Sequence, residues 1–427
     1  MLKRKRRSNP WRVFFLLILV GSVFYINQFI VPNTPPLFIP TSTPTRSPGS
    51  YIAEAEAFLE DGKNNLAIKS YEEAIQSDPK NVGNFVIVSR LQIYQGDFEN
   101  AITNAENALL LNPNNATAHA LRGWALGFQG NYLLAIGAVT SALELEPNNA
   151  SAHAIYAEIL ALQVNDGVGD LGTKDKAIEE SRIAKDLAPT LLESYRARGL
   201  VLEITGNYQE AALEFEAAIN INPNIADLHL SLGRNYRYLQ IYDKAVEEFN
   251  TANALNPSDY LPETYISRTY AAVGEYAKAI QYAQQAVVDK PEETWLYGNL
   301  GTMFYRNLQY RDAIDALSLA VRGGTTEDGQ QIEGLPLDYG RVAEYYYIYG
   351  LSLARYGDCG EALQISQAIL QGVPNDETAV FNAEEMVNIC KEYTVNGTPT
   401  PMISETEPQE TDLANEEDVE EENTPAE

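Results

Sequence analysis

Histidine and cysteine are the residues of this 427-residue sequence best suited to metal binding or nucleophilic chemistry. The chain has three histidines and two cysteines. His119, His153 and His229 lack the close spacing of zinc ligands, and they recur at equivalent places of a repeating pattern. Cys359 and Cys390 have no histidine near either of them to act as a base. The pattern therefore predicts packing roles for the histidines and no metal site or catalytic thiol.

Two short polar segments resemble ligand loops only superficially. The stretch from Gly323 to Thr326 lacks the Gly-Lys-Ser/Thr ending of a phosphate-binding loop, so we interpret it as a plain loop. Asp166 and Asp170, with glycines between them, lack the twelve-residue ligand spacing of a calcium loop. No nucleophile with a base and no paired catalytic carboxylates stand out, so we expect no enzyme activity and no cofactor.

The ends of the chain differ sharply in charge, within a net charge of −29 that argues against a nucleic-acid partner. Residues 1–12 are basic, and residues 13–31 carry no formal charge and are long enough for a transmembrane signal-anchor helix. The cations on one flank predict a single-pass protein with a cytoplasmic amino terminus, unless the segment is cleaved as a signal sequence. Residues 32–50 predict an extracytoplasmic stalk, and residues 395–427 predict a disordered acidic tail.

The body between these ends is a repeat. Prolines recur every 34 residues, with one interval of 42, at Pro79, Pro113, Pro147, Pro189, Pro223, Pro257 and Pro291. Twelve residues before each proline stands an alanine. Twelve residues before that alanine, or twenty in the one unit with an internal insertion, stands a small residue. Small residues let two helices approach closely, and proline ends the second helix of each unit.

This period and these small positions resemble the tetratricopeptide repeat (TPR) family. The resemblance implies an all-α fold, a right-handed α-solenoid of about nine helix-turn-helix units over residues 51–376. Insertions interrupt it near 163–174 and 322–337, and residues 377–394 predict a capping helix.

The resemblance also implies a concave groove that the first helices of successive units line, through which such proteins bind partners. The groove positions carry cations and aromatic rings, which dominate interface hot spots. The partner-binding residues predicted in this way are Arg196, Arg234, Arg237, Tyr238, Arg268, Trp295, Tyr305, Arg306, Tyr347 and Arg355. Further up the chain, Arg90, Tyr94, Trp124 and Phe128 share the lining with acids that include Glu158, Glu193, Glu203, Asp227 and Glu344.

Guanidinium groups bind carboxylates bidentately, so we expect a protein or peptide ligand that is extended and acidic or carboxyl-terminated. Its predicted centre is Arg234, Arg237, Arg268 and Arg306. Three alternatives stay open. The arginines could pair with neighbouring acids and only link the repeats, the acidic stretch 416–422 could fold back into the groove, or the groove could handle a glycan or lipid.

The two cysteines have a predicted structural role at the end of the array. Cys359 falls in the turn of the last unit, and Cys390 falls near the end of the capping helix. Two antiparallel helices would bring these thiols together, and an exported domain can oxidise them. A disulfide between Cys359 and Cys390 and a pair of buried small hydrophobic side chains are both consistent with this placement.

Overall fold

The computed structural model describes residues 9–30, 46–326 and 328–396, so most of the basic segment, most of the stalk and the tail 397–427 lie outside the described residues. The chain divides into two compact units, Met1–Asn84 and Phe85–Glu427. The first unit contains α1 (Pro10–Tyr25), a π-helical turn η1 (Ile26–Ile30), α2 (Pro48–Glu60) and α3 (Asn64–Ser77).

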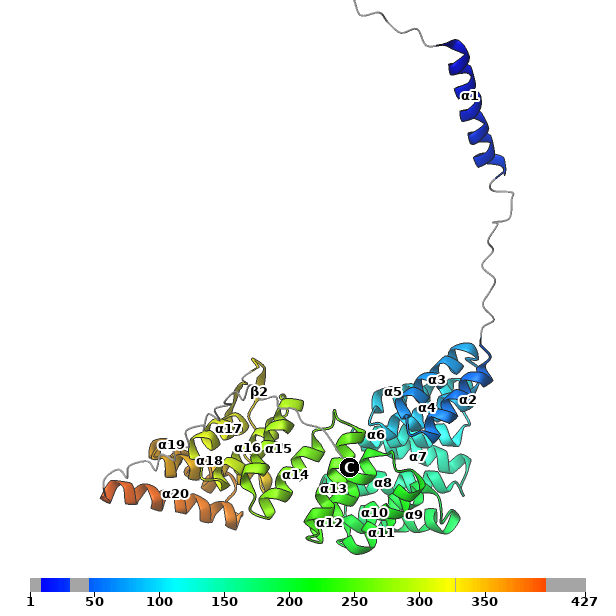
Figure 1. Cartoon of the computed structure of the whole chain (residues 1–427). Coiled ribbons are helices and arrows are strands. Elements are labelled where there is room, and N and C mark those ends of the chain that lie inside the picture. The colour runs from blue at the N-terminus through cyan, green and yellow to red at the C-terminus, as the bar shows by residue number, and fades with distance from the viewer. Residues whose placement is uncertain (1–8, 31–45, 327, 397–427) are drawn as a thin grey trace, which may run out of the picture. The chain divides into compact units, whose positions relative to one another are not determined.

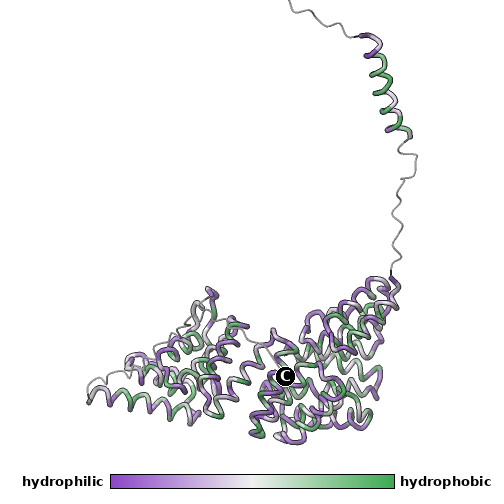
Figure 2. Tube along the Cα trace, viewed as in Figure 1, coloured by the Kyte–Doolittle hydropathy of each residue, from purple (hydrophilic) through white to green (hydrophobic). Residues whose placement is uncertain are grey.

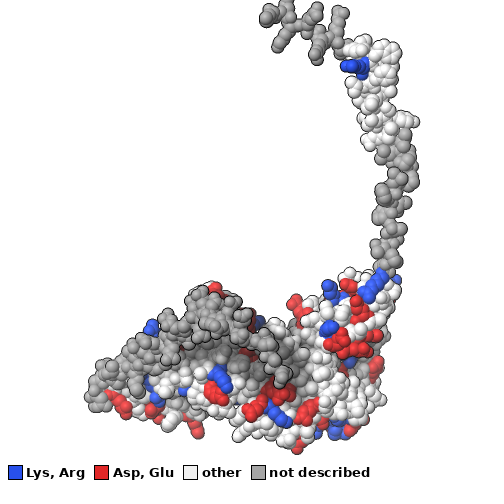
Figure 3. Space-filling model, in the orientation of Figure 1, with Lys and Arg blue, Asp and Glu red and all other residues white. Residues whose placement is uncertain are grey.

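Helix α1 is apolar along its whole length. The Asn9 side chain caps it by accepting from the amide of Trp11 at 3.2 Å, and Pro10 occupies its first turn. None of the described side chains of α1 is buried, and its visible face carries a cation only at its start (Figures 2 and 3). The apolar stretch Pro10–Phe29 spans 20 residues, or about 30 Å at 1.5 Å per residue. That length and composition fit a membrane span, and a signal sequence has the same properties.

Helix α2 begins at Pro48, inside the segment 32–50 that we predicted to be an extended stalk. Proline is well suited to the first turn of a helix, because its missing N–H would have no partner there. The boundary of the predicted stalk was therefore too late in the sequence.

The second unit is a series of antiparallel helix pairs followed by one more helix (Figure 1). Helix α4 (Val82–Tyr94) starts just before the boundary between the units. The bounds of the others are α5 (Phe98–Leu111), α6 (Ala116–Phe128), α7 (Tyr132–Leu145), α8 (Ala150–Asn165), α9 (Thr173–Leu187), α10 (Leu192–Ile204), α11 (Tyr208–Ile221), α12 (Ala226–Tyr238), α13 (Tyr242–Leu255), α14 (Leu261–Ala272), α15 (Tyr276–Asp289), α16 (Thr294–Arg306), α17 (Tyr310–Arg322), α18 (Arg341–Tyr356), α19 (Cys359–Gly372) and α20 (Glu377–Asn396).

The small repeat positions allow close approach within each pair, as the sequence predicts. A Cβ atom on Gly233 of α12 would lie 2.6 Å from the ring of Phe249 on α13. A Cβ on Gly301 of α16 would lie 2.4 Å from Cγ of Leu317 on α17. These distances are below van der Waals contact, so the glycines set how closely the paired helices pack.

The insertion near 163–174 becomes a short turn between α8 and α9. The Asp170 carboxylate accepts from the amide of Gly172 at 3.0 Å and from Thr173 Oγ1 at 2.8 Å. These local hydrogen bonds stabilise the start of α9. Asp170 remains solvated, so burial has little effect on its pKa. Hydrogen bonds from Thr173 and Gly172 lower the pKa of Asp170.

The insertion near 322–337 contains a β-hairpin where the sequence suggested a plain loop, so that interpretation was wrong. Strand β1 (Gly323–Thr325) pairs antiparallel with β2 (Gln331–Glu333), and Gly324 lies opposite Ile332. Ile332 is buried in a small core with Tyr297 and Ala320. Tertiary burial of this single isoleucine fixes the hairpin, and three-residue strands give too little sequence pattern to predict it.

Helix α20 covers the expected capping segment 377–394 and packs on both α18 and α19. Ala379, Ala383 and Met386 on one face of α20 are buried in the last hydrophobic core. The helix therefore closes the apolar end of the array, as a capping helix does.

Candidate functional site

The first helices of the pairs carry the predicted groove residues, and we call the side that bears these residues the first-helix face. Successive first helices contact one another, for example α8 with α10 and α16 with α18. On α4, Arg90 donates to Glu193 Oε1 of α10 at 2.7 Å, and Tyr94 Oη donates to the same oxygen at 3.3 Å. Glu193 is buried, so this end of the face is occupied by internal pairing.

Arg196 on α10 is fully enclosed by acids and rings. Its Nε donates to both carboxylate oxygens of Glu158 at 3.0 and 3.1 Å, and its Nη2 lies 2.6 Å from Asp227 Oδ2. The guanidinium also lies 5.2 Å from the ring centroid of Trp124. Arg196 is 2% exposed and Glu158 1% exposed, and because their polar atoms bond each other, neither is available to a ligand. We predicted Arg196 to be partner-binding, and the structure corrects this: it links α8, α10 and α12.

The buried Arg196–Glu158 pair has an electrostatic consequence. Burial raises the pKa of Glu158, and the Arg196 charge opposes that shift. Without the guanidinium, the carboxylate would be an uncompensated charge in the core.

Arg234 on α12 is also paired. Its Nε donates to Glu203 Oε1 at 2.8 Å and its Nη2 to Oε2 at 3.1 Å, a bidentate arrangement. Asn235 Nδ2 donates to Glu203 at 3.1 Å as well. The internal-pairing alternative therefore accounts for Arg234, which belonged to the predicted centre of the site.

Arg237 and Arg268 differ from these residues, because no carboxylate pairs with either in the described chain. Arg268 Nε donates to Asn299 Oδ1 at 3.0 Å, and its guanidinium lies 5.6 Å from the ring centroid of Trp295. Burial lowers the pKa of Arg268, and the cations of Arg341 and Arg237 lower it further. Two half-buried guanidinium groups thus lie near each other without an acid.

The remaining predicted residues lie on α12, α16 and α18. Arg306 is exposed, with Nη2 3.9 Å from Glu344 Oε1, and Arg355 lies 5.9 Å from the Tyr305 ring centroid. Tyr238 is 52% exposed and stacks on Tyr208 with centroids 4.4 Å apart. Trp295, Tyr305 and Tyr347 are partly buried against the last hydrophobic core.

Sequence reasoning missed Arg341 and Tyr345 on α18. Arg341 donates to Glu344 at 2.8 Å, and its charge reaches Arg268. Tyr345 is buried, which raises the pKa of its hydroxyl, and the charge and hydrogen bond of Arg268 oppose that rise. Arg341 precedes the repeat frame that is counted back from Pro374, and Tyr345 is in a core position, so neither matched a groove position.

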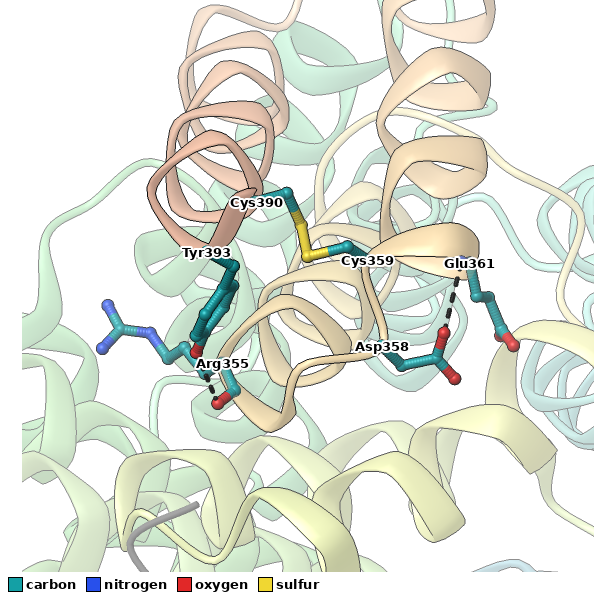
Figure 4. Close-up of a disulfide and its surroundings, with 6 residues drawn as sticks. All are labelled: Arg355, Asp358, Cys359, Glu361, Cys390 and Tyr393. Atoms are coloured by element: carbon teal, nitrogen blue, oxygen red, sulfur yellow. Dashed lines mark hydrogen bonds between the residues drawn. A yellow bond between two sulfur atoms is a disulfide. The ribbon is translucent and has the colours of Figure 1, made fainter. Parts of the chain in front are cut away.

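Cys359 and Cys390 form a disulfide between the start of α19 and the end of α20 (Figure 4). Their Cα atoms lie 5.5 Å apart, and the bond closes a sequence separation of 31 residues. Tyr393 Oη of α20 also donates to the carbonyl of Arg355 on α18 at 3.1 Å. Covalent and hydrogen bonds thus hold the capping helix in place.

The histidines have the packing role that the sequence predicts. One ring nitrogen of each contacts a proline carbonyl, at 2.9 Å in His119, His153 and His229 alike. His153 and His229 additionally place Nδ1 2.6 Å from a glutamate. The described residues contain no cluster of three His, Cys, Asp or Glu side chains that could hold a metal ion.

Comparison with known proteins agrees with the repeat geometry. Three family models, each described as a tetratricopeptide repeat, match residues 48–81, residues 89–127 and 121–190, and residues 192–225. A solved structure of a tetratricopeptide repeat protein from Parabacteroides merdae ATCC 43184 is 15% identical and covers 60% of this chain and 98% of its own. Its TM-score is 0.38, which adds nothing to the family-model matches. No curated protein matches the chain.

Proposed function

Because this chain belongs to the tetratricopeptide repeat proteins, which are protein-interaction scaffolds, we propose that it is a membrane-anchored scaffold for an extended acidic or carboxyl-terminated peptide. The peptide binds along the first-helix face between α12 and α18. The apolar helix Pro10–Phe29 anchors the chain, with the amino terminus in the cytoplasm and the repeats outside it.

One observation carries the ligand assignment. Arg90, Arg196 and Arg234 are each neutralised by a carboxylate of a neighbouring helix. Arg237 and Arg268, among the described residues, have no such partner, and exposed Arg306 lies only within 3.9 Å of one. Charge complementarity therefore favours an anionic ligand at α12–α18.

The binding face is tested by photo-crosslinking in intact membranes. A photoreactive amino acid replaces Tyr238 on α12, which is 52% exposed, in the full chain. The matched control replaces Leu213, which is 57% exposed on the second helix α11. We expect crosslinks only from position 238, to a segment that is rich in Asp and Glu or ends the partner chain.

A synthetic copy of the crosslinked segment then competes with the crosslink. Arg237→Gln combined with Arg306→Gln should weaken that competition at least about tenfold, the effect of losing about 1.4 kcal/mol of charge-assisted bonding. Arg182→Gln is the control, because Arg182 is exposed on the second helix α9 and paired only within that helix. Equal crosslinking from both positions, or a basic partner segment, would overturn the proposal.

The topology has a separate test. An epitope tag at residue 1 should resist protease added to intact cells, whereas the repeats should be cleaved or removed. A tag that is digested together with the repeats would contradict the cytoplasmic amino terminus.

A further inference from the structure

On the first-helix face, Arg268 lies within electrostatic reach of three side chains on two other helices, Arg237, Arg341 and Tyr345. Arg237 ends α12, Arg268 lies on α14, and Arg341 and Tyr345 lie on the first turns of α18. We infer that these residues form a binding site for a dianionic oxyanion, a phosphate monoester, carried by the peptide that the face binds. This inference rests on the proposed function and names the chemical group at its centre.

The Arg268 guanidinium is held in a fixed orientation. Its Nε donates to Asn299 Oδ1 at 3.0 Å, and one side of it lies over the Trp295 ring. Asn299 is itself buried, so the hydrogen bond is shielded from water. A guanidinium that is held in this way loses little conformational entropy when it binds a planar or tetrahedral oxyanion.

Tyr345 supplies a buried hydroxyl whose own proton has no acceptor among the described residues. The side chain is 2% exposed, and its Oη lies within reach of Arg268, whose charge and hydrogen bond partly offset the rise in the pKa of Tyr345 that burial causes. Arg237 Nε is likewise buried and without a described partner. Buried polar groups without partners are rare, and a bound ligand is one explanation.

Gly298 of α16 makes room for this tyrosine. A Cβ atom there would lie 2.5 Å from Cδ2 and Cε2 of the Tyr345 ring. The glycine therefore lets the ring pack against α16 with its hydroxyl near Arg268. An apolar side chain of the same size could fill that space, so the hydroxyl is not needed for packing.

The charge balance favours a dianion over a carboxylate. The charge of Glu344 acts on Tyr345, but this acid already bonds Arg341 at 2.8 Å and lies 3.9 Å from Arg306. Arg237 and Arg268 therefore carry two positive charges that the described chain does not neutralise. A carboxylate would cancel one of them, whereas a phosphate monoester carries about −1.5 to −2 at pH 7 and accepts from several donors.

The experiment uses the full chain in nanodiscs made of a zwitterionic lipid, and it measures binding of phenyl phosphate, phenyl sulfate and benzoate by calorimetry. We expect phenyl phosphate to bind at least about tenfold more tightly than the monoanions phenyl sulfate and benzoate. Arg268→Gln should weaken that binding more than about tenfold, and Arg182→Gln should leave it unchanged. Equal affinity for benzoate, or no effect of Arg268→Gln, would overturn the inference.

Tyr345→Phe removes only the hydroxyl and separates binding from folding. We expect it to weaken phenyl phosphate binding about three- to tenfold while the thermal transition changes by no more than about 2 °C, because the hydroxyl donates to no acceptor among the described residues. A fall in the transition temperature together with unchanged binding would assign the hydroxyl to the core and contradict the site.

Two further comparisons locate the source of the oxyanion. The acidic segment found by crosslinking is synthesised with and without one phosphorylated residue. The phosphorylated form should bind the wild-type chain more tightly, and the two forms should bind the Arg268→Gln variant equally. Stronger binding of the chain's repeats to phosphoinositide vesicles than to the phosphopeptide would overturn the peptide assignment. If phenyl phosphate fails while the unmodified segment still competes, the inference fails and the proposed function stands.

Discussion

The buried pair of Arg196 and Glu158 allows a direct test of whether a first-helix arginine serves the fold or a ligand. Substitution of Arg196 by Met keeps much of the side-chain volume and removes the charge. Glu158 is then left as a buried carboxylate with no bidentate partner, since Asp227 is also acidic. Removing one member of a buried pair costs about 3–5 kcal/mol, and 2% exposure of Arg196 gives little solvent screening to reduce this.

The double variant Arg196→Met with Glu158→Leu removes both charges. Replacing a buried pair by apolar residues of similar volume is close to neutral or stabilising, so we expect it within about 1 kcal/mol of the wild type. The coupling energy between the two positions is then at least about 2 kcal/mol. Arg182→Met is the surface control, because Arg182 is 57% exposed and its pairs contribute less than about 1 kcal/mol.

The assay is urea unfolding of the full chain, followed by circular dichroism and by hydrogen exchange of the amides in α8, α10 and α12. Exchange is needed because repeat arrays can unfold in parts. The pH dependence adds a second readout. In Arg196→Met the raised pKa of Glu158 rises further, so its stability deficit should shrink as pH falls and the carboxylate is protonated.

The reasoning would be refuted if Arg196→Met lost less than about 1 kcal/mol, or if the double variant were as unstable as the single one. The reasoning would also be refuted if Arg196→Met unfolded like the wild type but no longer bound the crosslinked segment. That result would return Arg196 to the set of ligand-binding residues.

Two other features of the fold give measurable predictions. Replacing Cys359 and Cys390 by Ala should lower the unfolding free energy of the last repeat by about 3–4 kcal/mol, because the disulfide closes a 31-residue separation. Hydrogen exchange in α20 should then be faster. If a reductant destabilised the double variant as much as the wild type, the prediction would be contradicted. A hydrogen bond with Glu180 raises the pKa of His153. Burial lowers the pKa of His229, but a hydrogen bond with Glu248 more than offsets this, so its pKa is raised as well. Both histidines therefore contribute stability below a pH of about 6.5, and this stability is lost as pH rises through their raised pKa values. Each substitution by Gln should remove about 1 kcal/mol of the stability gained between pH 8 and pH 6, which urea unfolding at the two pH values measures.

The sequence predicted the repeat frame well because the frame depends on local packing. Alanine and glycine at fixed positions and proline at the end of each unit act within one helix pair, and their effects do not depend on distant residues. The hairpin at Gly323–Glu333 was missed for the opposite reason, since burial of Ile332 against α16 and α17 fixes it. The sequence predicted that the two cysteines lie near each other but did not decide whether they form a disulfide. The packing of α20 on α19 brings their Cα atoms to 5.5 Å, a separation that allows the sulfur atoms to bond.

Apart from Arg341, the sequence by itself predicted which arginines lie on the first-helix face, because repeat position determines the direction of a side chain on its helix. It could not determine which of them are already neutralised. Arg196 and Arg234 bond acids that lie 38 and 31 residues away, whereas Arg237 and Arg268 have none among the described residues. Coulomb interactions depend on distances of a few ångströms between neighbouring helices, and only the tertiary structure sets those distances.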